Sequence, residues 1–96
     1  MYARVATFTS PKAEVDHAVA MVREQVEGDT PEALQGAQMM MLVNRETGAG
    51  LGITLFESEA AMKRGDEALN AMNPVGTEQR VGLEFYEVAV QTVTGS

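Results

Sequence analysis

Hydrophobic and polar positions along this chain form six segments in the order strand, helix, strand, strand, helix, strand. The strand segments combine β-branched, aromatic and other apolar residues in short runs. They span 2–9, 37–44, 51–56 and 81–92. The helical segments repeat apolar residues every three or four positions, after Ser10-Pro11 and after Ser58. The pattern accounts for residues 1–96 as a single α+β domain.

Capping and turn residues set the expected helix ends. Ser10 is a good N-cap and Pro11 suits the first helical position, while Gly28 ends the helix. Ser58 is the expected N-cap of the second helix, which 73–76 (Asn-Pro-Val-Gly) interrupts. Thr30-Pro31-Glu32 favours one short helical turn in the intervening connection. The apolar stripes are Val15, Ala18, Val19, Val22 and Val26 on the first helix, and Ala61, Met62, Gly65, Ala68, Leu69 and Met72 on the second.

Right-handed crossovers convert this order into a ferredoxin-like βαββαβ sandwich: an antiparallel sheet of order 4-1-3-2 with both helices on one face. Strand alternation then sorts the side chains between two faces. The helix-covered face is expected to hold Ala3, Val5, Met39, Met41, Val43, Leu51, Ile53, Leu55, Leu83 and Phe85. The open face is expected to hold Tyr2, Arg4, Phe8, Gln38, Met40, Leu42, Asn44, Thr54, Phe56, Glu84, Tyr86, Val88 and Val90. Because this open face is partly apolar, we expect it to form a homodimer.

Composition narrows the possible functions. The chain of 96 residues has a formal charge of −7, which argues against binding to nucleic acid. It has no cysteine, so thiol catalysis and disulfides are excluded. No apolar run reaches membrane-spanning length, and strand-like residues begin at Tyr2, so we expect a cytoplasmic protein without a signal peptide. The single histidine, His17, lies opposite the apolar stripe of its helix, so we expect it to face solvent and to bind no metal.

Two segments carry a resemblance to a known family. The segments LGITLFESEAAMKRGDEALNAM (51–72) and VGLEFYEVAVQ (81–91) resemble the antibiotic biosynthesis monooxygenases, and the strand Tyr2–Thr9 fits the same template. The resemblance implies a dimeric α+β barrel, in which the sheets of two protomers pack face to face. It also implies a pocket between each sheet and its helices. Members include cofactor-free oxygenases of phenols or quinols and haem-degrading enzymes.

The chain departs from the active members of that family. Similar haem-degrading proteins carry a histidine iron ligand on the second helix, with a tryptophan nearby. Here 59–72 contains no histidine and the chain has no tryptophan, so we expect no haem and no other cofactor. Cofactor-free members hold a phenol with Trp, Tyr, Asn or Arg side chains, which the expected helix-covered face lacks.

The candidate catalytic residues are Tyr86, Arg4 and Glu84. If the first and last strands pair Arg4 with Glu84, the same register pairs Tyr2 with Tyr86. Such a cluster could bind an anionic or phenolic ligand, with Tyr86 transferring a proton. A cross-strand ion pair inside a dimer interface explains the same residues and is the commoner arrangement. Asn44, Asn70 and Asn73 could each orient a substrate, but we expect Asn70 to face water, and turn or cap roles explain Asn44 and Asn73.

Methionines indicate a candidate ligand pocket between sheet and helices. Met is adaptable and suits either a pocket for a flat apolar molecule or an ordinary core. Gly65 either leaves space for such a ligand or allows close contact between helix and sheet, and close contact is favoured. The expected pocket residues are Met39, Met41, Ile53, Met62, Gly65, Met72 and Phe85.

Three functions therefore remain open. The first is cofactor-independent monooxygenation of a phenol or quinol. The second is non-catalytic binding of a small apolar ligand, such as an aromatic molecule. The third is a purely structural dimeric barrel module.

Overall fold

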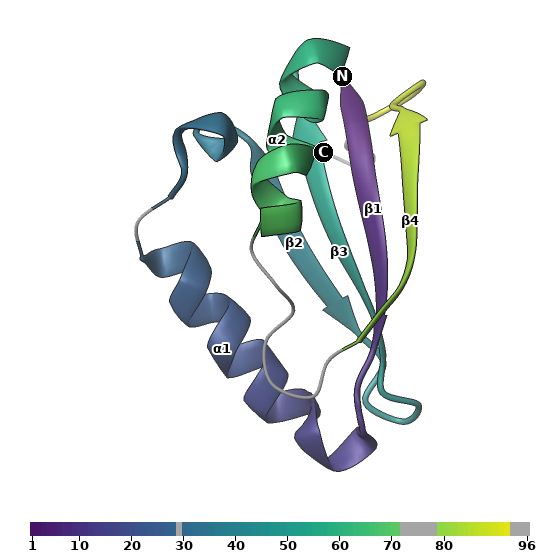
Figure 1. The fold of residues 1–96 in the computed structure, drawn as a ribbon. Coiled ribbons are helices and arrows are strands. Elements are labelled where there is room, and N and C mark those ends of the chain that lie inside the picture. Colours follow the sequence, from purple (N-terminus) through teal and green to yellow (C-terminus); the bar gives the residue numbers. More distant parts are fainter. Residues whose placement is uncertain (29, 72–78, 93–96) are drawn as a thin grey trace.

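The computed structural model describes residues 1–28, 30–71 and 79–92. The order of strands and α-helices along the chain is the expected one. The elements are β1 (Tyr2–Thr9), the 3₁₀ turn η1 (Lys12–Glu14), α1 (Val15–Glu27), the 3₁₀ turn η2 (Glu32–Leu34), β2 (Gln38–Val43), β3 (Ala49–Phe56), α2 (Glu59–Ala71) and β4 (Gln79–Glu87). The strands form one antiparallel sheet of order β2-β3-β1-β4, which confirms the expected order. Both helices lie on the same side of the sheet (Figure 1).

Two helix starts behave differently from one another. The Ser58 hydroxyl accepts a hydrogen bond from the Ala61 amide at 3.1 Å, so the expected cap of α2 is confirmed. The expected cap at Ser10 is wrong. The Ser10 amide instead donates to the Gly48 carbonyl at 3.0 Å, and the chain enters α1 through η1 without a side-chain cap. The end of α1 at Gly28 and the helical turn after Pro31 are as expected, while the expected break at 73–76 falls outside the described residues.

The main error in the sequence-based sorting concerns β1 and β3. The side chains expected on the open face of these two strands lie on the helix side, and those expected on the helix side lie on the open face. Arg4 bonds to side chains of α2, and Phe56 packs in the core beneath that helix, although both were expected on the open face. The helix side of these two strands carries Tyr2, Arg4, Ala6, Phe8, Gly50, Gly52, Thr54 and Phe56. The open side carries Ala3, Val5, Thr7, Leu51, Ile53 and Leu55.

The two edge strands are oriented as expected. Met39 is paired with Thr54, so Met39, Met41 and Val43 share the helix side, and Met40 and Leu42 lie on the open side. Phe85 is paired with Arg4, which places Phe85 and Leu83 on the helix side of β4. β4 ends at Glu87, so the expected strand residues Val88 and Val90 lie beyond it.

The buried core is small and lies under α2. Leu34, Phe56 and Met62 are its buried members, with Ala61 and Leu69 packed against it. Gly65 is also buried, and a Cβ atom at this position would overlap the ring of Phe56. Gly65 therefore serves close contact between α2 and β3, which is the alternative that the sequence favoured.

Candidate functional site

A large groove separates α1 from the helix side of the sheet. Its volume is about 1130 Å³, and described residues of α1, β1, β2, β3, α2 and β4 line it. The apolar part of this lining consists mainly of Phe8, Val19, Val22, Met39, Met41 and Leu69. This volume is slightly above the usual range for small-molecule sites, about 300–1,000 Å³.

The burial of α1 shows how the groove arises. At the start of the helix Val15 and Ala18 are each only 4% exposed, whereas Val26 in the last turn is 43% exposed. Val19 and Val22, between them, are half-buried and line the groove. The apolar stripe that the sequence predicts for α1 therefore packs at one end and faces the groove along the rest of its length.

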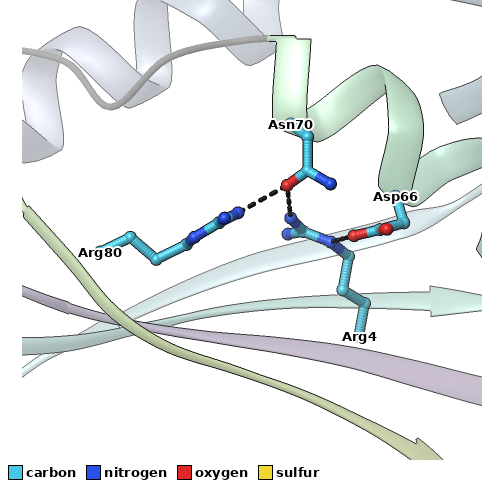
Figure 2. Close-up of polar contacts among 4 residues, drawn as sticks. All are labelled: Arg4, Asp66, Asn70 and Arg80. Atoms are coloured by element: carbon cyan, nitrogen blue, oxygen red, sulfur yellow. Dashed lines mark hydrogen bonds and ion pairs between the residues drawn. The ribbon is translucent and has the colours of Figure 1, made fainter.

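A polar cluster lies between the helix side of the sheet and α2 (Figure 2), and its residues Arg4, Asn70 and Arg80 line the groove. The Nε of Arg4 donates to Asp66 Oδ1 at 2.7 Å, and its Nη2 donates to Asn70 Oδ1 at 3.1 Å. The Nη1 of Arg80, from β4, donates to the same Asn70 oxygen at 2.6 Å. The cluster thus connects the central strand β1, the edge strand β4 and the second helix.

The two arginines of this cluster are in different environments. Arg4 is 5% exposed and is paired with Asp66, whose side chain is 22% exposed. Arg80 is exposed, and no described carboxylate lies within ion-pair distance of it. Because both guanidinium groups donate to Asn70 Oδ1, the orientation of this amide is fixed and its NH₂ group is turned away from them.

The three residues predicted as catalytic are not brought together. Arg4 is paired with Phe85, so the expected pairing with Glu84 is wrong by one residue, as is that of Tyr2 with Tyr86. A shift of one residue moves a side chain to the opposite face. Glu84 and Tyr86 therefore lie on the open face, across the sheet from Arg4.

The residues predicted for the pocket divide into several groups. Met39 and Met41 line the groove, as expected. Met62 and Gly65 belong to the core under α2 instead. Ile53 borders the groove, although alternation with Thr54 directs its side chain to the open face. Phe85 is not part of the groove lining and is 46% exposed, and Met72 falls outside the described residues.

Sequence reasoning missed Asp66 and Arg80, and it set Asn70 aside as a residue that faces water. A signal was present, because Asp66 and Asn70 are four residues apart and so lie on one helix face, next to the apolar positions Gly65 and Leu69. This signal was overlooked because Asn70 was expected to face water. Asn70 is exposed, but its side chain also bonds to both arginines.

A second hollow, of about 530 Å³, lies between η2 and the start of α2. Its charged lining carries both signs, with Glu32 and Glu57 against Arg64, so it favours no single ligand charge. Within the described parts of the chain, no three His, Asp or Glu side chains gather as a metal site would require. His17 is exposed, as expected.

Comparisons with known proteins give no relative for this chain. No family model, no curated protein and no solved structure matches it. None of the helices among the described residues is both long enough and apolar enough to cross a lipid bilayer.

Proposed function

We propose that this protein binds a small, predominantly apolar molecule in the groove between α1 and the sheet. The observation that carries the proposal is the lining of this groove: Val19 and Val22 face Met39 and Met41 across a space of about 1130 Å³. Burial of an apolar ligand against these side chains gives about 25 cal/mol per Å² removed from water. Methionine side chains adapt to ligands of different shape, which suits a binding site.

The test uses a neutral, apolar fluorescent probe, N-phenyl-1-naphthylamine, titrated into the purified protein. We expect saturable binding to the wild type and at least about 10-fold weaker binding to Val22→Trp, because the indole would fill the groove. Ala20→Trp is the matched control, since Ala20 is exposed on the same helix and does not line the groove. Equal binding to both variants would show that the probe does not use the groove.

A second candidate function is cofactor-independent oxygenation of a phenol, in agreement with the resemblance to the antibiotic biosynthesis monooxygenases. The observation that favours it is the group of donors from Arg4 and Arg80 at the groove wall, which would stabilise a phenolate. In the balanced reaction a phenol with an unsubstituted para carbon reacts with O₂ to give a para-quinone and water. The phenol supplies all four electrons, so no other reductant is needed. Tyr86 and Glu84 have no part in this proposal, because they lie across the sheet.

Oxygenation is tested with 1-naphthol, whose product would be 1,4-naphthoquinone. We expect one O₂ consumed per quinone formed, with the rate lowered in Val22→Trp and unchanged in Ala20→Trp. Binding of 1-naphthol without oxygen uptake would leave the binding function and remove the oxygenase.

A homodimer formed through the open face is part of the same proposal. The open side of β3 carries Leu51, Ile53 and Leu55, whereas its helix side carries Gly50, Gly52 and Thr54 with Phe56 as its one large apolar residue. The more apolar side of this strand is thus the one that no helix covers. Covering it with the same face of a second copy would complete a ferredoxin-like dimeric barrel, and sedimentation velocity at micromolar concentration measures the expected dimer.

A further inference from the structure

We propose that the ligand of the groove is an anion, an apolar molecule with a carboxylate or sulfonate group, and that Arg80, Asn70 and Arg4 recognise its charged end. This inference rests on the proposed function, because it assigns the charge of the molecule that the groove would hold. The three residues come from β4, α2 and β1, and each of them lines the groove.

The three residues of the cluster that line the groove, Arg4, Asn70 and Arg80, offer a ligand only donors, and the Asp66 carboxylate is not among the lining residues. The Asn70 oxygen already accepts from both arginines, so the amide offers only its NH₂ group. Arg80 uses one of its N–H groups on Asn70, and the guanidinium has five. A ligand in the groove that meets these three residues must therefore supply acceptor oxygens, and a planar carboxylate fits a guanidinium in a bidentate manner.

The charge of the groove favours an anion over a neutral acceptor. The chain as a whole is acidic, at −7, yet Arg4, Arg23, Arg45 and Arg80 all line this groove. Glu27 is the only carboxylate among the described lining residues. Asp66 and Asp16 are paired with Arg4 and Arg45, which leaves Arg23 and Arg80 without a carboxylate partner among the described residues.

The position of Arg80 suits recognition of an incoming charge. Arg4 is buried and already neutralised, so it acts mainly by holding Asn70 in place. Arg80 is exposed and is held at the groove by a neutral amide oxygen, which orients the guanidinium without cancelling its charge. Apolar side chains such as Leu69 lie in the same groove and would contact the body of the ligand.

The experiment compares two probes that share one aromatic body. N-phenyl-1-naphthylamine is neutral, and 8-anilinonaphthalene-1-sulfonate carries one negative charge. We expect the wild type to bind the sulfonate about 10-fold more tightly than the neutral probe, a typical gain for a charge-assisted hydrogen bond. In Arg80→Gln the sulfonate should lose this advantage, while affinity for the neutral probe stays the same. Lys63→Gln, which removes an exposed positive charge of α2 outside the groove, should bind both probes like the wild type.

Arg80→Lys provides a second variant that retains the charge, and it should keep part of the advantage because a lysine cannot bind the sulfonate in a bidentate manner. Equal affinity of the wild type for the two probes, or an advantage that survives Arg80→Gln, would overturn the inference and leave the apolar groove intact. Failure of the neutral probe to bind the groove would instead overturn the proposed function itself.

Discussion

The Nε of Arg4, on the central strand, donates to the Asp66 carboxylate of α2 at 2.7 Å, and the arginine side chain is only 6% exposed. This ion pair joins the middle of the sheet to the helix that covers it. A buried guanidinium needs an acceptor for its charge, so the pair also fixes which face of β1 is turned toward α2. The orientation of the whole strand follows from it, because alternate side chains of a strand share one face.

Removal of the Arg4 guanidinium should destabilise the fold more than removal of the whole pair. In Arg4→Met the Asp66 carboxylate, 22% exposed, loses its partner, and we expect the free energy of unfolding to fall by about 2–3 kcal/mol. Arg4→Met combined with Asp66→Leu should be less destabilising than Arg4→Met alone, because no unpaired charge remains. Chemical denaturation of the single and double variants measures this coupling.

An exposed ion pair of the same helix serves as the control. The Lys63 ammonium lies 3.4 Å from Glu59, with both side chains more than half exposed. Lys63→Met should change the free energy of unfolding by about 0.5 kcal/mol or less. If Arg4→Met were as mild as Lys63→Met, the buried pair would have no structural role.

Gly65 should not tolerate even a methyl group. A Cβ atom here would overlap the Cε1 and Cζ atoms of Phe56, a ring that is only 4% exposed. We expect Gly65→Ala to lower the free energy of unfolding by about 1–3 kcal/mol through overpacking, although alanine favours the helix by about 1 kcal/mol. In a Phe56→Leu background, the smaller side chain should remove most of this penalty, and thermal melting of the four proteins tests the coupling. A stabilising Gly65→Ala would mean that the helix and strand are not in close contact.

Alanine substitutions at two glycines with positive φ distinguish the cost of backbone strain from the cost of steric overlap. Gly36 has a φ of 84°, and a Cβ atom added to it would meet nothing within 4 Å, whereas a Cβ on Gly48, at a φ of 81°, would overlap the Ser10 carbonyl oxygen. Gly36→Ala should cost about 1–2 kcal/mol of stability from its dihedral angle alone. Gly48→Ala should cost about 1–3 kcal/mol more, because the backbone of Ser10 must move. Equal denaturation midpoints would show that the Ser10–Gly48 contact is loose.

Element order and sheet order were predictable from the sequence, but the faces of the two central strands were not. Periodicity and turn residues locate strands and helices, and right-handed crossovers then fix their order. On β3, however, the leucines and Ile53 lie on the open side, while Phe56 and two glycines lie on the helix side. Sorting by apolarity alone places the more apolar set inward, so it fails where that set faces away from the helices.

The candidate site was predictable only in its apolar part. Met39 and Met41 follow from alternation on β2 and were correctly placed. The Arg4 cluster depends on a register that the sequence leaves open, because a shift of one residue exchanges Phe85 for Glu84 as the partner of Arg4. It also joins residues 62 to 66 positions apart in the chain, whose proximity only the folded structure shows.

The open face supplies the last prediction, which concerns assembly. Leu42 is 46% exposed on the edge strand β2, and Met40, 45% exposed, lies on the same face. In the proposed dimer Leu42→Lys would bury an unpaired ammonium group against apolar side chains, which is strongly unfavourable. We therefore expect this variant to sediment as a monomer at a concentration where the wild type is dimeric.

Ala60→Lys is the control for the added charge, because Ala60 is exposed in the first turn of α2, on the other side of the sheet. It should sediment as a dimer. Since the core under α2 is small, we also expect the melting temperature of Leu42→Lys to be lower and that of the wild type to rise with protein concentration, as mass action requires for a dimer. A wild-type protein that sediments as a monomer and melts independently of concentration would rule out the dimer, and the apolar side of β3 would then be exposed to water.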